Sequence, residues 1–424
     1  QHVVIADALR HAIRSEGTLF PTYLKELMGG GNIYHFSYYG YLRPDILIGA
    51  LLIHIDMQTI IIAYSVLMMT LSVLCCYIFL RQHTKDENIC IFVSLLVLLS
   101  SIFFHSHKQI MFVNYMPFLF LALISIEKKN FVAFTLCGSL IVLHSYFYCI
   151  GCFIVCFIYL LYRHPGEWKK LFVSYILIVL LTAILTIPTL LVILSNGKSG
   201  APTQLASLFI PSLNLKGLLY SEYGCGLTYI SYVLLVLALS DKQLQKLSAV
   251  CLVSFYSPFV WFIMNGFLYA RSKIMLVFIP LVAYIMCMML VKIKEGNIKL
   301  SKYSLVLLII PVFFIKYPLS ALIDCLFVIL LLLQKRKNRI YAYLVIPMLV
   351  VSYTNCPSSF YQPKKYEKNV SQLVRRNKIV TAADLTTRQN VNQTYGNRIN
   401  RVSGYTSTNN RYYNTFLFDT LRIP

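Results

Sequence analysis

The residues whose side chains could carry chemistry gather in the first part of the chain, residues 1–56. Carboxylates such as Asp7 and Asp45 occur there beside the guanidinium groups of Arg10 and Arg43, in a chain of which only 13% is charged. A carboxylate can take a proton from an attacking hydroxyl, and a cation can stabilise a departing phosphate. We therefore expect chemistry in this segment, with the rest of the chain as scaffold or as a cavity beneath it.

A run of glycines and aromatic residues stands inside this segment. The glycines 29–31 can adopt positive φ and let a ligand approach the backbone closely. Asn32 follows them, and then an aromatic cluster formed by Tyr34, Phe36, Tyr38, Tyr39 and Tyr41. Such a cluster is typical of an interfacial aromatic belt, although aromatic faces also stack on sugar rings. The aromatic residues alone favour the belt, and the sugar platform is the alternative.

Further ionisable groups stand at the predicted outer ends of later apolar segments. Such groups are costly in lipid unless they face a wet cavity, so they are functional candidates. Arg271 and Lys273 could hold a lipid phosphate, or could simply reach the headgroup region with their long side chains. His105 and His144 are candidate hydrogen-bond partners, and Glu222 is the acid of the outside loop 197–228.

The composition predicts an all-α polytopic membrane protein. Hydrophobic residues make up 58% of the chain, and they form runs of the length needed to cross hydrocarbon, about 15–25 residues. About 12 spans are expected between residues 57 and 354. Their predicted bounds are 57–80, 89–106, 109–126, 131–145, 146–162, 171–196, 229–240, 248–268, 274–291, 303–316, 317–334 and 340–354.

The net charge of +22 reflects topology and not nucleic-acid binding. If residues 1–56 lie outside, the predicted inside loops carry 17 Lys and Arg residues and the short outside connections carry 6. This asymmetry follows the positive-inside rule and favours that orientation. The 12 cysteines show no ligand spacing, and most stand in apolar runs, so neither a zinc site nor a disulfide framework is indicated.

Three parts are expected along the chain. Residues 1–56 form an extracytoplasmic loop with interfacial helices, in which an amphipathic helix ends at Gly17 and a short apolar piece spans 46–55. Residues 57–354 form the transmembrane bundle. Residues 355–424 are polar, with strand and turn patterns, and are interpreted as the start of an extracytoplasmic soluble domain.

Several stretches together resemble the bacterial YfhO membrane-protein family. They include Gln1-His2 with Asp7 and Arg10, the segment 29–40, and Arg43-Pro44-Asp45. The resemblance continues at HKQIMFVNYMPFLFL (107–121), YSEYGCGLT (220–228) and YARSKIMLVFIP (269–280), and at residues 401–419. Members of the family are typically about twice as long, and an acidic residue tends to precede the Gln-His pair, so both ends of the family pattern are expected to be missing here.

The resemblance implies a GT-C type membrane glycosyltransferase of the bacterial plasma membrane. Such an enzyme would move a sugar from a polyprenyl-phosphate donor to an extracytoplasmic envelope polymer such as teichoic or lipoteichoic acid. Asp7 would be the catalytic acid–base residue; without the resemblance, it is better interpreted as a surface charge paired with Arg10 or His11. No cofactor is implied with certainty, although a divalent metal could stabilise the leaving phosphate. The expected substrate-binding residues are His2, Arg10, Asn32, Tyr38, Tyr39, Arg43, Asp45, His105, His144, Glu222, Arg271 and Lys273.

Two other classes of function remain open. A flippase or transporter of lipid-linked sugar would show ionisable residues at mid-membrane depth and an inverted repeat, and only Asp324 stands deep in a predicted span. A non-catalytic assembly protein of the cell envelope is the third interpretation. In all three cases the partners are membrane lipids and envelope polymers, and no nucleic acid.

Overall fold

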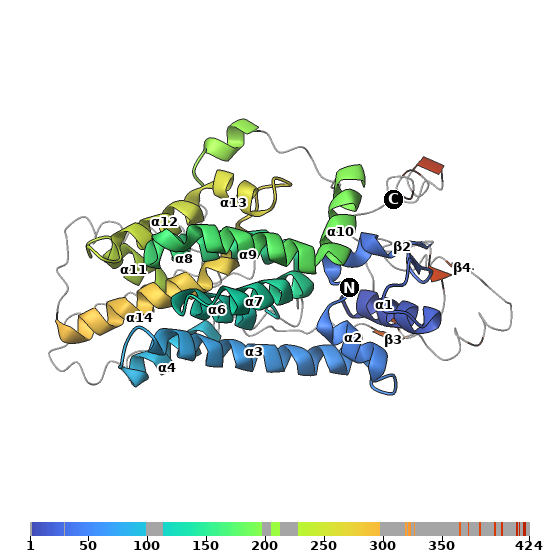
Figure 1. Ribbon diagram of the computed structural model, residues 1–424, viewed down its shortest axis with the longest axis horizontal. Helices are drawn as coiled ribbons and strands as arrows, with labels where there is room; N and C mark the ends of the chain where they lie inside the picture. Colours follow the sequence, from blue (N-terminus) through green and yellow to red (C-terminus); the bar gives the residue numbers. More distant parts are fainter. Residues whose placement is uncertain are drawn as a thin grey trace.

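The chain folds mainly into α-helices, as its composition predicts. The computed structural model describes residues 2–28, 30–98, 113–196, 205–212 and 228–296, with short pieces and single residues beyond 318. Most of the described helices run roughly along the longest dimension of the molecule, and the N-terminal segment lies at one end of them (Figure 1).

The helices of the bundle follow the apolar runs of the sequence. They are α3 (Met57–Arg81), α4 (Glu87–Leu98), α6 (Met116–Glu127), α7 (Phe131–His144), α8 (Tyr146–Arg163), α9 (Trp168–Leu181), α10 (Ala183–Asn196), α11 (Tyr229–Ala238), α12 (Gln245–Tyr256), α13 (Pro258–Met264) and α14 (Ile279–Glu295). Short 3-10 helices are η3 (Pro165–Glu167), η4 (Leu205–Phe209) and η6 (Ser272–Phe278).

Several of these helices could cross a membrane. Among the described residues, three segments are long and apolar enough, namely Met57–Arg81, Tyr146–Arg163 and Ser272–Glu295, and up to five are if each bent helix pair is one span. The exposed side chains of the first two segments are largely aliphatic, as expected of a surface that faces lipid, whereas Ser272–Glu295 is mostly buried. The predicted spans 303–316, 317–334 and 340–354 fall almost entirely outside the described residues.

Two predicted spans are not straight helices. The stretch expected at 171–196 is the pair α9 and α10, which meet at 83°, and the stretch expected at 248–268 is the pair α12 and α13, which meet at 92°. The second bend has a local cause: Pro258 is the first residue of α13, and the Ser257 hydroxyl accepts a hydrogen bond from the Val260 amide at 3.3 Å. The first bend, at Thr182, has no proline or glycine beside it.

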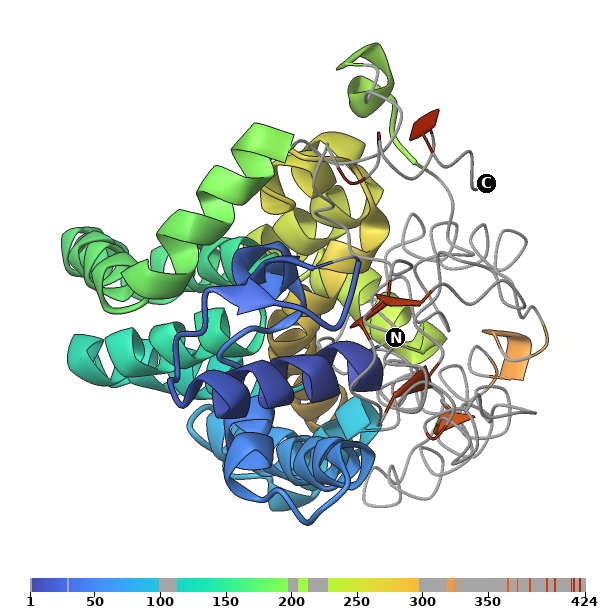
Figure 2. The same ribbon diagram turned by 90° about the vertical axis from the view of Figure 1, so that its right-hand side faces the viewer.

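The N-terminal segment is a compact layer that closes one end of the bundle. It comprises α1 (His2–Glu16), β1 (Tyr23–Leu24), β2 (Gly31–Asn32), η1 (Ile33–Tyr39) and α2 (Pro44–Leu51), with β1 and β2 antiparallel. Helix α1 ends at Gly17, as predicted, where φ is +66°. It buries its apolar side chains against α2 and α3, and η1 packs on α8 and α10. Figure 2 shows α1 lying across this end of the bundle.

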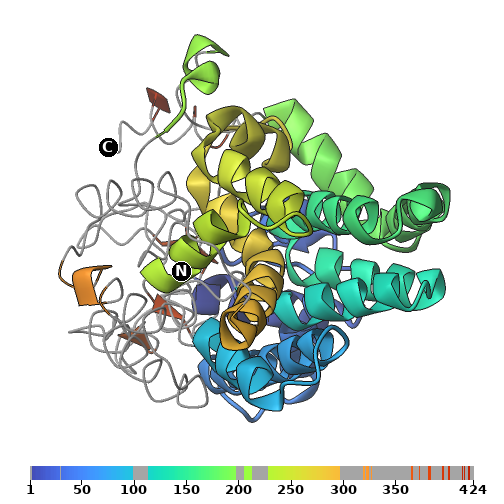
Figure 3. The ribbon, with the colours of Figure 1, turned by 90° about the vertical axis from the view of Figure 1, so that its left-hand side faces the viewer.

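The opposite end, which we call the connection end, carries the α3–α4, α6–α7, α8–α9 and α11–α12 links. There Lys294 at the end of α14 lies 2.5 Å from Asp86 in the α3–α4 link, and Lys292 pairs with Asp241 in the α11–α12 link. Arg163 at the end of α8 lies 2.6 Å from Glu127 at the end of α6. Figure 3 faces this end, where α14 lies between α4 and the pair α11 and α12. The described loops predicted to share one side of the membrane therefore lie together.

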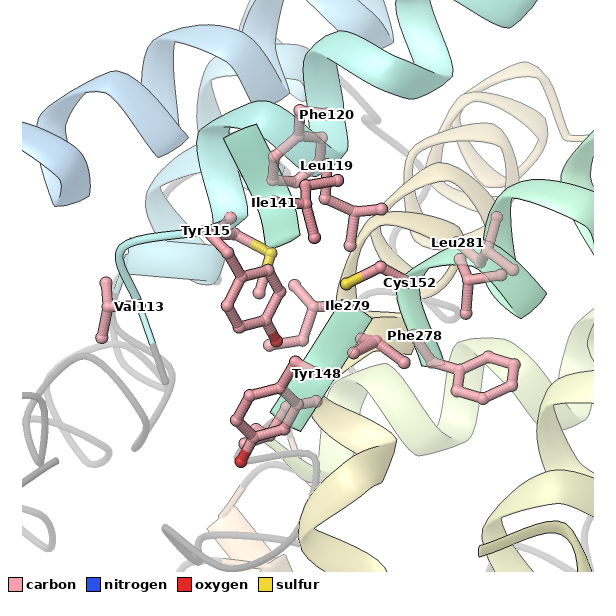
Figure 4. Close-up of a cluster of buried hydrophobic side chains, with 14 of the residues drawn as sticks. Val113, Tyr115, Leu119, Phe120, Ile141, Tyr148, Cys152, Phe278, Ile279 and Leu281 are labelled. Carbon is pink, nitrogen blue, oxygen red and sulfur yellow. The ribbon is translucent and has the colours of Figure 1, made fainter. Parts of the chain in front are cut away.

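The core between the two ends is apolar and aromatic. Side chains from α6, α7, α8 and α14 meet there around Leu119, Ile141, Cys152 and Leu281 (Figure 4). The rings of Tyr115 and Tyr148 stack at a centroid distance of 5.1 Å. Most described cysteines, including Cys152, are buried in this packing, as the apolar sequence context predicts.

The described part of residues 355–424 consists of short strand pieces. Strand β3 (Lys364–Lys365) pairs in parallel with β5 (Thr394–Tyr395), and β4 (Thr381–Ala382) pairs in parallel with β6 (Asn400–Arg401). Strand β5 also contacts α1. The rest of this region lies outside the described residues, so the soluble domain expected here stays a prediction.

Candidate functional site

Helix α1 places the predicted catalytic residue Asp7 in a buried ion pair. Residues three apart face the same side of a helix, and the Arg10 Nη2 atom lies 2.5 Å from Asp7 Oδ1. The other terminal nitrogen of Arg10 donates to the Ile55 carbonyl at 2.9 Å, which connects α1 to the chain after α2. Asp7 is only 4% exposed. The expected pairing with Arg10 is therefore present, but Asp7 is not a solvent-facing charge.

A second ion pair, between Arg43 and Asp45, lies at the start of α2. Arg43 donates from Nε to Asp45 Oδ1 at 2.5 Å and from Nη2 to Oδ2 at 2.7 Å, a two-point contact that a guanidinium favours. Both side chains are at most 1% exposed. Gly40 makes room for this pair, because its φ is +106° and a Cβ there would lie 2.9 Å from Arg43 Cδ.

His144 at the end of α7 is buried beside Tyr64 of α3. Its Nδ1 lies 2.7 Å from the Leu140 carbonyl oxygen, so in the neutral ring this nitrogen carries the hydrogen, and Nε2 accepts from the Tyr64 hydroxyl at 2.6 Å. The charges of Arg43 and Asp45 act on both groups. The predicted residues Arg43, Asp45 and His144 therefore belong to one buried polar cluster.

The two predicted cations, Arg271 and Lys273, lie on aromatic rings at the same end of the bundle. Lys273 Nζ is 4.1 Å from the centroid of Phe147, and Arg271 Cζ is 5.6 Å from that of Tyr269. The two rings stack on each other at 6.1 Å. Asn265 holds the turn before them, since its amide donates to the Trp261 carbonyl at 2.8 Å and to the Arg271 carbonyl at 3.4 Å. The Arg271 side chain is exposed.

His2 lies at the start of α1. Desolvation is the main cause that lowers the pKa of His2 to about 3, and the positive charges of Arg43 and Lys273 act in the same direction. The imidazole is therefore neutral at physiological pH. Helix α8 contacts both η1 of the N-terminal segment and η6, so the cations of η6 lie near this segment.

A hollow of about 610 Å³ lies between α1 and the β1 region. His11 lies in its wall, with Nδ1 3.4 Å from Glu26 Oε1 and Nε2 4.0 Å from Asp7 Oδ1. The hydrogen bond to Glu26 raises the pKa of His11; the charges of Glu26 and Asp7 act in the same direction, and burial and Arg10 oppose them. His11 therefore stands between the hollow and buried Asp7.

The remaining predicted residues have other positions. Asn32 is exposed and caps η1, since its side-chain oxygen accepts from the Tyr34 amide at 2.9 Å, which gives it a structural role. Tyr38 and Tyr39 belong to η1, but their side chains lie outside the described part, as do His105 and Glu222.

The sequence did not indicate Tyr64, Phe147 or Tyr269 as site residues. It also did not show that His11 and Glu26 line a hollow. Tyr64 and Phe147 contact the predicted residues His144 and Lys273, which are distant from them in the sequence. Tyr269 and His11 had local signals, because Tyr269 stands two residues before Arg271 and His11 stands four residues after Asp7 on the same helix.

No described group of three or more His, Cys, Asp or Glu residues could hold a metal ion. Comparisons with protein-family models, characterised proteins and solved structures gave no match for this chain.

Proposed function

We propose that this protein is a GT-C type membrane glycosyltransferase that resembles the YfhO family. It would transfer a sugar from a polyprenyl-phosphate donor to an extracytoplasmic envelope polymer, such as teichoic or lipoteichoic acid, in a bacterial plasma membrane. The observation that carries this proposal is the burial of the Asp7–Arg10 and Arg43–Asp45 ion pairs at the end of the bundle where Lys273 lies on the ring of Phe147. Carboxylates, cations and a lipid-facing surface occur together there, and transfer from a lipid phosphate needs all three.

The transfer step assigns a role to each group. The acceptor hydroxyl attacks the anomeric carbon of the donor sugar, the bond from that carbon to the phosphate oxygen breaks, and polyprenyl phosphate leaves. Asp7 takes the hydroxyl proton, and Arg10 keeps its carboxylate in place. Arg271 and Lys273 stabilise the departing phosphate. The isoprenoid chain lies along the apolar helices.

The bent helix pairs favour a second candidate, a flippase or transporter of lipid-linked sugar. Transporters build their sites from interrupted membrane helices, and α9–α10 and α12–α13 are bent by 83° and 92°. In this case the cations at η6 would guide the phosphate of the cargo, and no glycosidic bond would form.

A transfer assay in proteoliposomes tests the proposal. The protein is supplied with a polyprenyl-phosphate sugar labelled in the sugar and with a purified teichoic acid acceptor whose repeating unit contains a sugar. Asp7→Asn should lower the transfer rate about 10²- to 10⁴-fold, the range for loss of a general base. Lys273→Gln should raise the donor concentration needed for half-maximal rate.

The matched control is Glu87→Gln, which removes the carboxylate of the exposed Arg81–Glu87 pair at the connection end. This variant should transfer sugar at the wild-type rate. Wild-type rates in both Asp7→Asn and Lys273→Gln would contradict the site. If labelled lipid crosses the vesicle bilayer without forming labelled polymer, the protein is a flippase and not a transferase.

A further inference from the structure

The hollow beside α1 is not used by the buried ion pairs or by the cations of η6. Its polar wall is formed by His11, Arg14 and Glu16 from α1 and its C-terminal end, and by Tyr23, Lys25 and Glu26 from the β1 region. The volume of about 610 Å³ lies within the range of small-molecule sites, about 300–1,000 Å³. The site is therefore large enough for a ligand of one or two sugar rings.

The wall presents both signs of charge and an aromatic ring. Arg14 and Lys25 donate hydrogen bonds, whereas Glu16 and Glu26 accept them, so neither a simple anion nor a simple cation matches the whole lining. A neutral ligand with many hydroxyl groups does match, since each hydroxyl can donate and accept. Tyr23 is 44% exposed and offers a ring face on which a sugar can stack.

The glycine run explains the position of this ring. Gly30 has φ of +89°, and a Cβ at this position would collide with the Tyr23 hydroxyl. Any other residue would therefore displace the Tyr23 ring as well as strain the backbone. Gly30 also donates from its amide to the Leu27 carbonyl at 3.0 Å, which closes the turn behind Glu26.

The hollow communicates with Asp7 through His11. One imidazole nitrogen faces Glu26 at 3.4 Å and the other faces Asp7 at 4.0 Å. Asp7 itself does not belong to the lining of the hollow. A ligand hydroxyl bound there therefore meets His11 before it meets the buried carboxylate.

We propose that the hollow between α1 and β1 binds a saccharide unit of the acceptor polymer, which stacks on Tyr23 and hydrogen-bonds to Glu26 and His11. The identification of this saccharide as the acceptor rests on the proposed transferase function; the binding of a saccharide does not. In the transferase, His11 is a positioning residue that orients the ligand hydroxyl toward Asp7.

Ligand-observed saturation-transfer NMR on the full chain in nanodiscs tests the binding. Glucose, N-acetylglucosamine and glycerol 3-phosphate are used as separate probes, with no donor present. We expect the neutral sugars to give signals. Tyr23→Ala, which removes the stacking ring, and Glu26→Gln, which removes the charged acceptor, should each weaken their binding about tenfold.

A second kind of variant fills the hollow and leaves Tyr23 and Glu26 in place. Ser15→Trp adds a large ring at an exposed position on the wall of the hollow and should abolish the signals, whereas Thr70→Trp on the exposed face of α3 should not change them. Unchanged signals in Tyr23→Ala, Glu26→Gln and Ser15→Trp would overturn the proposal, as would signals from glycerol 3-phosphate alone. If sugar binding depends on Tyr23 but the protein transfers no sugar, the proposed binding site is supported and the proposed transferase function is refuted.

Discussion

The two ends of the helix bundle use charge in different ways. At the N-terminal end, the side chains of the Arg43–Asp45 and Arg10–Asp7 pairs are at most 9% exposed. At the connection end, the Arg81–Glu87 pair has side chains 30% and 64% exposed, and Lys170 opposite Glu167 is 66% exposed. The connection end therefore holds ion pairs in contact with solvent, whereas the N-terminal end holds them inside protein.

This difference has an energetic meaning. An exposed ion pair contributes about 0–1 kcal/mol, and it links neighbouring loops at little cost. A buried pair pays a desolvation penalty that its own attraction barely offsets, so it is weak evidence for stability. Burial of two such pairs beside His144 and Lys273 is therefore better explained by what the N-terminal end binds than by what it stabilises.

The largest expected effect of a single substitution is that of Asp45→Asn. The change leaves the Arg43 guanidinium buried without its carboxylate, and removal of one partner of a buried pair costs about 3–5 kcal/mol. The free energy of unfolding in detergent, measured by SDS titration, should fall by this amount.

The double variant Arg43→Met/Asp45→Leu sharpens the result. It removes both charges and fills the same space with apolar groups, so the free energy of unfolding should return close to that of the wild type. If the double variant is as unstable as Asp45→Asn, the Arg43–Asp45 pair is needed for stability, and its burial gives no reason to expect binding at the N-terminal end.

A smaller loss is expected from Tyr64→Phe. His144 Nε2 then loses the hydroxyl that lies 2.6 Å away, and a buried acceptor left without a donor costs about 1–3 kcal/mol. The matched control at the connection end is Tyr162→Phe, since the Tyr162 hydroxyl donates to the Gln243 carbonyl at 3.3 Å in an exposed position. The control should change the free energy of unfolding by about 0.5 kcal/mol or less. Equal losses in the two variants would contradict the contrast between a buried and an exposed end.

The helices were largely predictable from the sequence, and the reason is physical. An apolar run longer than about 17 residues has one stable form in lipid, so α3 and α8 lie close to their predicted bounds. The bend at Pro258 is indicated by the Ser257-Pro258 pair, since proline is typical of the first residue of a new helix. The bend at Thr182 has no such signal, because the break lies in an uninterrupted apolar run, so only tertiary packing can place it.

The sequence indicates single residues of the candidate site but not their arrangement. Polar groups at the ends of apolar runs singled out His144 and Lys273 as candidates. Their partners could not be found in this way, because Tyr64 is 80 residues from His144 in the sequence and lies inside an apolar helix. The burial of Asp7 was also unpredictable, since the periodicity of α1 places it on a polar face, and the elements that pack on α1 are distant in the sequence.

A pH effect is expected at the rim of the N-terminal end. The pKa of His11 is raised in the folded chain, chiefly by the hydrogen bond to Glu26, with Asp7 acting in the same direction and Arg10 against it. The folded state then holds a proton that the unfolded state releases near pH 6.5. The stability from His11 is complete below this pH and is lost as pH rises through the folded pKa.

Thermal unfolding of the wild type and His11→Gln between pH 6 and pH 9 measures this effect. The wild type should lose more stability than the variant as pH rises, and the difference between them should be greatest at pH 6. A constant difference across this range would mean that His11 is not protonated in the folded state.

The smallest effect is expected from Glu87→Gln at the connection end. Glu87 Oε1 lies 3.0 Å from Arg81 Nη2, but solvent screens both side chains, so the loss should be at most about 1 kcal/mol. It should shrink further between 50 mM and 500 mM salt, because exposed pairs are screened over a Debye length of about 10 Å at 0.1 M. Asp45→Asn should keep most of its cost at the same salt concentrations. If both losses respond to salt alike, burial does not distinguish the two ends, and the buried pairs offer no argument for a binding site.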